Sequence, residues 1–485
     1  MLKCAAFAAP IPTISFPSAS EPTLTTHRLR PGSLSAPWRA LLALPLFSLW
    51  VIAAGNPSRA APVLMISVDG LKPEYVLEAD AHGLKIPFLR GMLRDGAYAR
   101  GVAGVWPTVT YPSHTTLLTG LSPAEHGIYN NLEFDPKNTF GNAWYWYAQQ
   151  IRVPTLWQAA HEAGLSTASI GWPVSVGATS VDFLIPEYWR VARLTDVDPS
   201  DALLIAAVSR PEGLLQKMQA RLGPYMRGND PSPPGDEIKT RYALDILKNQ
   251  KPKFMTIHLS SLDEQQHGHG PFSPEANQDL EAIDGQLAQL FAASRANDPK
   301  AVAVVVSDHG FVHITHKVNL MQPFMRAGLV QSGGAWQAQP WSGAGMAAVM
   351  LRDPADSQVQ AQVRGLLQSM KADPNYGIAE VLEGGAIKER GAFPDAAFLI
   401  IMNLGYYALA DATSPLLSEV QGNQGSHGFS PEYPEMRASF FIAGKGIARH
   451  RDLGVIDMRQ VAPTVAQLLN VHLPSATRAP LPIHQ

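Results

Sequence analysis

The sequence predicts an α/β fold in which a mostly parallel central sheet carries helices on both faces. Three short runs predict its strands, because they are almost wholly apolar and contain many β-branched residues: Val63–Val68, Phe254–Leu259 and Val302–Val306. Such runs are typical of strands that are buried on both faces of a parallel sheet. Carboxylate or imidazole side chains follow each run, as expected where parallel strands lead into a binding site.

Polar side chains of the metal-binding type stand at or just beyond the ends of these runs. Asp69 follows the first run, Asp308 and His309 follow the third, and Asp263 and His267 come four residues apart beyond the second. Ligands of open α/β sheets bind beyond the carboxyl ends of the strands, so these side chains are expected to converge. Taken singly, each has an ordinary explanation, such as an Asp-Gly turn or one exposed face of a helix.

His427, in Gly-Ser-His-Gly, adds a third histidine of this kind, although a histidine between glycines is ordinarily a loop residue. Carboxylate oxygens and imidazole nitrogens, without cysteine, suit zinc or another divalent transition ion. Three histidines argue against a site for magnesium or calcium alone. We therefore expect two divalent metal ions, with zinc as the first choice.

Thr110 lies just before a predicted helix. Pro112 suits the first turn of that helix, Thr115–Leu118 continues it and Gly120 ends it. Thr110 would then lie beside free backbone amides and the partial positive charge of a helix N-terminus. A threonine hydroxyl bound there to a divalent ion loses its proton more easily and can attack phosphorus. The alternative is that Thr110 only caps the helix.

The motifs together resemble one known family. They are Val-Asp-Gly at 68–70, the run from Thr110 to Ile128, Asp263 to Pro271, Ser-Asp-His-Gly at 307–310, Gly-Ser-His-Gly at 425–428 and Ile-Asp-Met-Arg-Gln-Val-Ala-Pro-Thr-Val at 456–465. From Val63 to about Leu473 the chain resembles the type I phosphodiesterase and nucleotide pyrophosphatase family of the alkaline phosphatase superfamily. The resemblance implies an alkaline-phosphatase-like fold. It also implies one metal held by Asp263, His267 and His427, and a second held by Asp69, Asp308, His309 and the nucleophile Thr110.

The resemblance implies further roles around the nucleophile. Asn131 matches an asparagine that holds a phosphoryl oxygen, while its neighbour Asn130 is expected to be a turn residue. Tyr111 matches an aromatic residue that stacks on the base in relatives acting on nucleotides, and Trp172 resembles a second segment lining that pocket. Packing in the core is the alternative for both rings. His114, near these motifs, is expected to hydrogen-bond behind the metal ligands or to serve the fold.

Residues 1–60 are interpreted as a signal-peptide region. Ala40–Ala54 is apolar, follows Arg28, Arg30 and Arg39, and precedes small residues, but it is short for a membrane span. An uncleaved membrane anchor through 40–54 is the alternative. Cys4 is the single cysteine, so cleavage would leave a mature chain without disulfides. This pattern fits a secreted enzyme of the bacterial periplasm.

Residues 61–485 are predicted to form one catalytic domain with insertions at about 180–235 and 319–424, which would shape the substrate pocket as a cap. The formal net charge of −3 provides no basic surface, so a long nucleic acid is not an expected partner. The expected partner is a small phosphodiester or nucleotide substrate, and no stable protein partner is implied.

Three functions fit this sequence. The first is a metal-dependent phosphodiesterase or nucleotide pyrophosphatase that forms a phosphothreonine intermediate on Thr110. The second is a hydrolase of monoesters, phosphonates or lipid head groups with the same two-metal site. The third is a catalytically silent binding protein of the same fold, against which the complete set of ligands and the intact Thr110 argue. The site residues alone do not separate the first two.

Overall fold

The computed structural model describes residues 60–137, 143–189, 201–226, 230–331 and 334–484 of the 485-residue chain. These residues belong to one compact unit, Ala54–Gln485. The predicted signal segment, Ala40–Ala54, lies outside the described residues. Within the described ranges, no helix combines the length and the apolar character that a membrane crossing requires.

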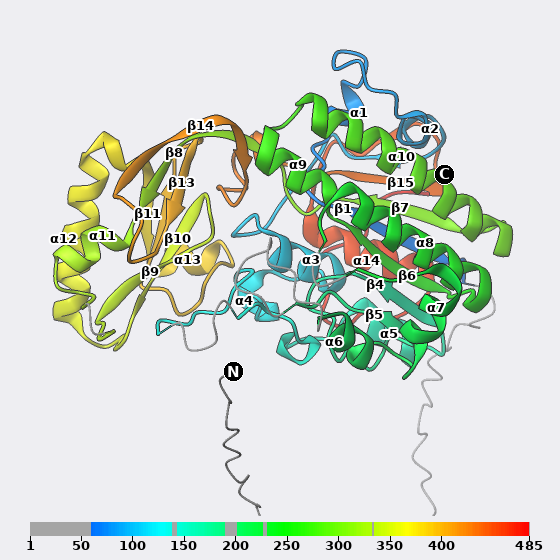
Figure 1. The fold of residues 1–485 in the computed structure, drawn as a ribbon, viewed down its shortest axis with the longest axis horizontal. Coiled ribbons are helices and arrows are strands. Elements are labelled where there is room, and N and C mark those ends of the chain that lie inside the picture. The colour runs from blue at the N-terminus through cyan, green and yellow to red at the C-terminus, as the bar shows by residue number, and fades with distance from the viewer. Residues whose placement is uncertain (1–59, 138–142, 190–200, 227–229, 332–333, 485) are drawn as a thin grey trace, which may run out of the picture. The chain divides into compact units, whose positions relative to one another are not determined.

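The main sheet is built around the three predicted strands, which form with the predicted bounds as β1 (Val63–Val68), β6 (Phe254–Leu259) and β7 (Val302–Val306). Strand β1 pairs in parallel with β6 on one side and with β7 on the other. The full order is β16-β2-β15-β7-β1-β6-β4-β5 (Figure 1). The outer strands are β4 (Thr167–Ile170), β5 (Phe183–Ile185), β15 (Phe440–Gly444), β2 (Ala97–Tyr98) and β16 (Arg451–Asp452). Because only β15 runs antiparallel to its neighbours, the predicted mostly parallel sheet is confirmed.

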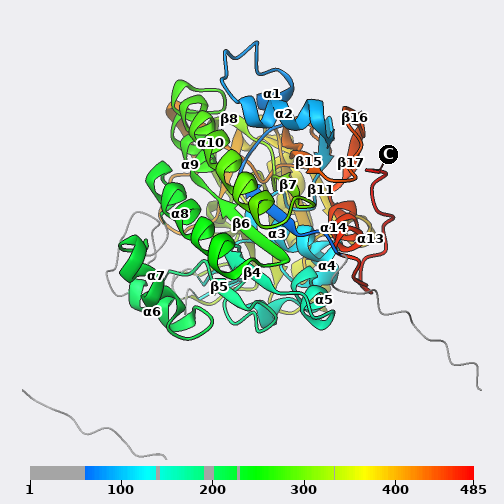
Figure 2. The same ribbon diagram turned by 90° about the vertical axis from the view of Figure 1, so that its right-hand side faces the viewer.

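Both faces of this sheet are covered, which explains why its central strands are apolar throughout. Leu64 and Ile66 pack into the core on one face, and Val63 and Met65 pack into the core on the other. Figure 2 shows the two groups of helices on opposite sides of the sheet. One group contains α8 (Pro233–Gln250) and α10 (Pro274–Asn297), and the other contains α3 (Thr110–Thr119), α5 (Leu156–Glu162) and α14 (Val461–Leu469).

Residues 312–426 form separate sheets with a core of their own, and we call this part the small lobe (Figure 1). One sheet has the order β11-β12-β10-β9, and the other has the order β13-β8-β14. Its elements are β8 (Val312–Asn319), α11 (Met321–Arg326), β9 (Ala338–Ser342), β10 (Met346–Leu351), α12 (Ser357–Ala372), β11 (Ile378–Glu383), α13 (Gly385–Glu389), β12 (Phe398–Met402), β13 (Tyr406–Leu409) and β14 (Leu417–Ser426). The lobe includes the predicted insertion at 319–424, and its function as a cap stays a prediction.

The other predicted insertion, at about 180–235, is partly continuous with the main sheet. Its first residues form β5, which pairs in parallel with β4. Helices α6 (Asp201–Val208) and α7 (Leu214–Leu222) follow before α8 begins at Pro233. Smaller elements elsewhere are α1 (Glu74–Leu77), α2 (Pro87–Asp95), α4 (Pro123–His126), β3 (Gly101–Ala103) and β17 (Val455–Asp457).

Candidate functional site

The ends of two neighbouring parallel strands bring the first group of predicted ligands together. Asp69 directly follows β1, and Asp308 and His309 directly follow β7. His309 Nε2 lies 3.4 Å from Asp69 Oδ1 and 3.1 Å from Asp308 Oδ2. These side chains are buried and converge although they are more than 200 residues apart in the chain.

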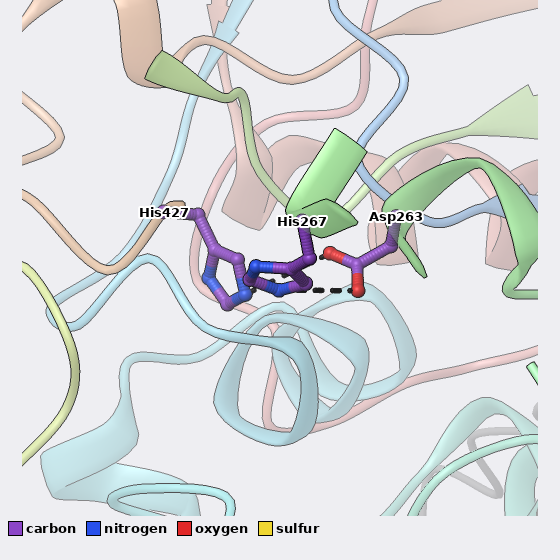
Figure 3. Close-up of side chains that lie close together, drawn as sticks. All are labelled: Asp263, His267 and His427. Carbon is purple, nitrogen blue, oxygen red and sulfur yellow. Dashed lines mark ion pairs between the residues drawn. The ribbon is translucent and has the colours of Figure 1, made fainter. Parts of the chain in front are cut away.

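The second group combines a helix of the main domain with a strand of the small lobe. Helix α9 (Ser261–His269) follows β6 and carries Asp263 and His267 four residues apart, with 3.3 Å between Asp263 Oδ2 and His267 Nε2. His427 follows β14, and its Nε2 lies 3.7 Å from Asp263 Oδ1. Figure 3 shows the two imidazole rings and the carboxylate facing one another.

Two sets of ligand-type atoms are close enough to hold an ion. Asp263, His267 and His427 form one set, and Asp69, Asp263 and His309 form the other, with the ligand-type atoms of each set within 4.8 Å of one another. The sets are adjacent, since the rings of His309 and His427 stack with centroids 3.6 Å apart. Asp263 thus belongs to both, whereas the resemblance assigns Asp308 to the second ion. Asp308 remains beside His309, so the exact ligand assignment stays a prediction.

All three predicted histidine ligands are held in the same way. The Nδ1–H group of each ring donates to a backbone carbonyl oxygen, and Nε2 is left for a ligand. The bonds are His267 to Gly425 at 3.0 Å, His309 to Gly310 at 3.3 Å and His427 to Thr108 at 3.0 Å. Metal-binding histidines characteristically donate their second ring N–H in this manner, which fixes the tautomer and the ring orientation.

Several buried polar atoms at this site lack a hydrogen-bond partner among the residues that the structure describes. They are Asp69 Oδ1, Asp263 Oδ1, Asp308 Oδ2 and His309 Nε2. Buried polar atoms are ordinarily paired, because an unpaired one loses its hydration without compensation. The orphaned atoms are oxygens and a nitrogen of the type that binds divalent transition ions, so the donor set fits such ions.

The pKa values at the site reflect the crowding of charges, and they differ between the histidines: although burial lowers the pKa of His309, the charge of Asp308 raises it to about 9. Burial, and then the charges of Asp308 and Asp263, raise the pKa of Asp69 well above its usual value. Burial, and then the charges of His309 and His267, lower the pKa of His427 well below its usual value. A cation would relieve the repulsion between the carboxylates, and a neutral imidazole is the form that binds a metal.

Glycines directly after the ligands make these close approaches possible. Gly70 has φ +69°, and a Cβ there would lie 2.8 Å from Gln266 Nε2. A Cβ on Gly310 would lie 2.0 Å from the Glu435 carbonyl oxygen. The first glycine is required by its left-handed conformation, and the second by the approach of another backbone segment. The Asp-Gly and His-Gly pairs of the sequence are therefore needed for packing as well as for turning the chain.

Thr110 is the first residue of α3, and the backbone around it contacts one predicted ligand directly and another through His114. The Thr108 carbonyl oxygen accepts from His427, while His114 Nδ1 lies 3.6 Å from Asp308 Oδ2 and donates to the Thr110 carbonyl oxygen at 2.8 Å. The helix ends at Gly120 in the left-handed conformation, as predicted. The N-terminus of α3 has fewer free backbone N–H groups than most helices. Pro112 has no N–H, and the Tyr111 N–H is bonded to Asn131.

That bond involves Asn131. Its Oδ1 accepts from the Tyr111 N–H at 2.9 Å, so the side chain is anchored through its oxygen next to Thr110, and donation from its amide N–H₂ group to a phosphoryl oxygen stays a prediction. The neighbouring Asn130 is used differently. Its Nδ2 donates to the Ser342 carbonyl oxygen of β9 at 2.7 Å, and its Oδ1 accepts from the Asn131 N–H. Asn130 therefore ties the loop to the small lobe in addition to forming the expected turn.

The two predicted substrate-stacking rings are buried. Tyr111 is 1% exposed, its hydroxyl donates to Glu187 Oε1 at 2.8 Å, and its ring packs against Trp144 with centroids 5.2 Å apart. Trp172 is 0% exposed and packs edge-on against His114. This geometry corresponds to the alternative of core packing for both rings. Their contact with a substrate base stays a prediction, and in the described conformation neither ring has an open face.

Two residues that contact the site, His258 and Glu187, had no role predicted from the sequence. His258 Nε2 donates to Asp69 Oδ2 at 3.0 Å, and His258 Nδ1 lies 3.1 Å from Glu187 Oε2. His258 is a polar residue inside the apolar run that forms β6, and this interruption of the run could have indicated a role at the site. Glu187 follows β5 in the sequence Pro-Glu-Tyr, which matches no binding or catalytic motif, so the sequence did not indicate its contact with the site.

Comparison with known proteins agrees with this geometry. The family model of type I phosphodiesterase / nucleotide pyrophosphatase matches residues 63–430. The chain belongs to this family. It is similar to human ectonucleotide pyrophosphatase/phosphodiesterase family member 1, with 24% identity over 261 residues, which are 51% of this chain and 23% of the human protein. It is also similar to the venom phosphodiesterase of Naja atra, with 24% identity over 53% of this chain and 27% of that protein.

The match therefore spans about a quarter of the length of these relatives. Among solved structures, murine ectonucleotide pyrophosphatase/phosphodiesterase 5, in an inactive form in complex with AMP, aligns with a TM-score of 0.59 and 17% identity. The alignment covers 87% of this chain and 97% of that one. At this identity the likeness establishes the fold, which is the alkaline-phosphatase-like arrangement that the sequence predicted.

The different contacts of Asn131 and Asn130 lead to a paired prediction. Asn131→Ala removes the predicted donor beside Thr110 and also the acceptor of the Tyr111 N–H, so we expect turnover of a phosphodiester to fall by about 10²–10³ and the free energy of unfolding to fall by about 1–3 kcal/mol. Asn130→Ala breaks a buried bond to the small lobe, so we expect a loss of about 1–3 kcal/mol in the free energy of unfolding and less than tenfold in turnover. Steady-state kinetics at saturating metal and thermal unfolding measure both effects. A larger loss of turnover for Asn130→Ala would show that Asn130 holds the phosphoryl oxygen.

Proposed function

We propose that this chain is a metal-dependent hydrolase of phosphodiester or pyrophosphate bonds in small molecules such as nucleotides. One observation carries the proposal: carboxylates and imidazoles from β1, α9, β7 and β14 converge with unpaired ligand atoms next to the N-terminus of α3, where Thr110 lies. Membership of a family whose relatives are named as pyrophosphatases and phosphodiesterases supports it. The AMP complex of the murine relative supports a nucleotide substrate.

The metal ligands in this proposal are the predicted ones. Asp263, His267 and His427 would hold one divalent ion, and Asp69, Asp308, His309 and Thr110 would hold the other. Bound divalent ions neutralise charge on phosphoryl oxygens and promote loss of the proton from a hydroxyl group at neutral pH. We propose zinc, because the set contains three imidazoles and no thiolate.

The chain's own residues would then carry the reaction in two displacements. Thr110 Oγ1 gives up its proton and attacks phosphorus, the bond from phosphorus to the leaving oxygen breaks, the departing group takes up a proton, and the phosphoryl part of the substrate remains esterified to Thr110 as phosphothreonine. Asn131, anchored by Tyr111 N–H, donates its amide hydrogen to a phosphoryl oxygen as that oxygen gains charge. A water oxygen then attacks phosphorus, the bond to Thr110 Oγ1 breaks and the hydroxyl is restored. The imidazoles of His267, His309 and His427 keep their orientation throughout, because backbone carbonyls accept from their Nδ1–H groups.

A second candidate keeps the same chemistry on substrates without a stacked base. The observation that favours it is the burial of Tyr111 and Trp172, which leaves neither ring open to a nucleobase in the described conformation. Monoesters, phosphonates and phosphorylated lipid head groups present the reacting phosphorus without requiring such a surface.

Metal content provides the first test of the proposal. The purified protein should contain about two zinc ions per chain, lose activity when a chelator removes them and regain it when zinc is restored, because the unpaired ligand atoms then recover their partners. Elemental analysis alongside a phosphodiesterase assay makes this measurement. Full turnover by a rigorously metal-free preparation would disprove metal dependence.

Replacement of the nucleophile provides the second test. Thr110→Ala removes the hydroxyl and leaves the carboxylates and imidazoles in place, so folding and most zinc binding should persist while turnover falls by several orders of magnitude. Thr110→Ser, which keeps a hydroxyl, is the matched control and should retain part of the activity. Mass spectrometry of acid-quenched wild-type enzyme should reveal a phosphorylated Thr110. Near wild-type turnover by Thr110→Ala would mean that water attacks directly.

Substrate choice separates the two candidates. We expect a chromogenic thymidine monophosphate diester to be hydrolysed with a higher kcat/KM than the corresponding phosphate monoester. A simple aromatic diester without a nucleoside tests base stacking, because stacking contributes about 1–3 kcal/mol per base, roughly 5–150-fold in affinity. Equal efficiency on the two diesters would mean that Tyr111 and Trp172 remain in the core during catalysis. A clear preference for the monoester would favour the second candidate.

A further inference from the structure

A buried chain of hydrogen bonds runs from the side chain of Tyr111, the residue after Thr110, to the predicted metal ligand Asp69. The Tyr111 hydroxyl donates to Glu187 Oε1 at 2.8 Å, and Glu187 Oε2 lies 3.1 Å from His258 Nδ1. His258 Nε2 then donates to Asp69 Oδ2 at 3.0 Å. The side chain of Glu187 is 12% exposed and that of His258 is 2% exposed, so water competes little for these contacts.

The residues of this chain come from separate elements of the main domain. His258 is the fifth residue of β6 and pairs in register with Ser67 of β1, which brings it level with the end of the strand that leads to Asp69. Glu187 follows β5 at the edge of the sheet, and Tyr111 is in the first turn of α3. The carbonyl oxygen of Gly171, directly after β4, also faces His258 Nδ1 at 3.1 Å. Both ring nitrogens of His258 therefore face oxygen acceptors, which fixes the ring in one orientation when both nitrogens carry hydrogen.

This arrangement determines how Asp69 presents its carboxylate. Oδ2 is occupied by His258, whereas Oδ1 faces His309 Nε2 at 3.4 Å and has no hydrogen-bond partner within the described part of the chain. Without the bond to His258 the carboxylate could rotate about its last torsion and exchange the two oxygens. With the bond, a single oxygen is directed at the ligand set.

We infer that Glu187 and His258 are positioning residues, which orient Asp69 for metal binding and hold Tyr111 beside the nucleophile. The inference rests on the proposed function, since Asp69 has to bind an ion for its orientation to matter. Stability alone explains these residues poorly, because an apolar set of similar volume commonly matches or exceeds the stability of a buried polar set. Groups behind metal ligands, by contrast, typically contribute about 10–100-fold to metal affinity.

Zinc binding by variants of His258 tests this inference without relying on activity. His258→Phe fills the space but removes both ring nitrogens, so we expect the second zinc ion to bind about 10–100-fold more weakly, with the first ion affected much less. His258→Gln keeps an N–H donor within reach of Asp69 and should lose less than tenfold. Affinities are measured by competition between the metal-free protein and a chromogenic zinc chelator, with elemental analysis to count the ions.

Glu187 provides the second arm, in case His258→Phe folds poorly. Glu187→Ala removes the group that holds both the imidazole and the Tyr111 hydroxyl, whereas Glu187→Gln can keep one amide oxygen for His258 and one N–H₂ group for Tyr111. We expect Glu187→Ala to weaken the second zinc ion by about tenfold or more and Glu187→Gln to restore most of that loss.

Thr256→Val is the matched control. Thr256 is on the same strand as His258 and is also buried and hydrogen-bonded, to Ser169 at 2.8 Å and to Trp157 at 3.2 Å, but it does not contact the chain that leads to Asp69. Its replacement should lower thermal stability while leaving both zinc affinities unchanged. Thermal unfolding of the metal-free proteins separates a loss of stability from a loss of metal binding.

The possible results are distinguishable. Weaker binding of one ion in His258→Phe and Glu187→Ala, restored by the Gln variants and absent in Thr256→Val, supports the inference. Wild-type affinity for two zinc ions in both His258→Phe and Glu187→Ala overturns it, as does an equal loss in all variants including Thr256→Val. A wild-type protein that binds no zinc overturns the proposed function itself, and the positioning role falls with it.

Discussion

The repulsion between buried carboxylates is the constraint on which this site depends. The ends of β1 and β7 and the start of α9 bring together the buried Asp69 and Asp308 and the partly buried Asp263. Each additional negative charge in such surroundings raises the energy of the others. The crowded carboxylates are therefore stable only where nearby positive charge or hydrogen-bond donors offset their repulsion, and the neighbouring residues provide some of these donors.

Hydrogen bonds from the surrounding protein satisfy some of the carboxylate oxygens, and the others remain without a partner in the described part of the chain. The Gly70 N–H donates to Asp308 Oδ1, and His258 donates to Asp69, so each of these carboxylates has one oxygen satisfied within the protein. The imidazoles of His267, His309 and His427 donate their Nδ1–H groups to backbone carbonyls and direct Nε2 toward the carboxylates. A scaffold built only for stability would have no reason to leave the inner atoms unpaired. Their pattern is that of a site preorganised for cations.

The main features of the fold and most of the site could be predicted from local patterns. The strands β1, β6 and β7 form with the predicted bounds because buried parallel strands require continuous apolar runs, and their ends locate Asp69, Asp308 and His309. The four-residue spacing of Asp263 and His267 likewise predicts one helical face. The convergence of His427 with that pair could be expected from the family resemblance alone, because it depends on how a strand of the small lobe is packed.

Features that arise from tertiary packing were less accessible. The assignment of 180–235 as an insertion missed the short strand β5, whose three residues are too few to show a period. The burial of Tyr111 depends on Trp144 and Glu187, which are distant in sequence, and the loss of free amides at α3 depends on Asn131. The contacts of a single residue such as Glu187 are with residues distant in the sequence, so no local sequence pattern predicts them.

The bond between Asn130 and the Ser342 carbonyl has a consequence for how this enzyme family can be engineered. It makes the loop that carries Asn131 a shared part of the main domain and the small lobe, since the same loop is fastened to α3 through the Tyr111 N–H. Grafting a lobe from another relative would have to reproduce the backbone position of β9 to within the tolerance of a hydrogen bond. A transplanted lobe that fits its own core but shifts that carbonyl would move Asn131, the proposed donor, relative to Thr110, the proposed nucleophile. An exchange of the small lobe between relatives should therefore include residues 130 and 131 together with the lobe.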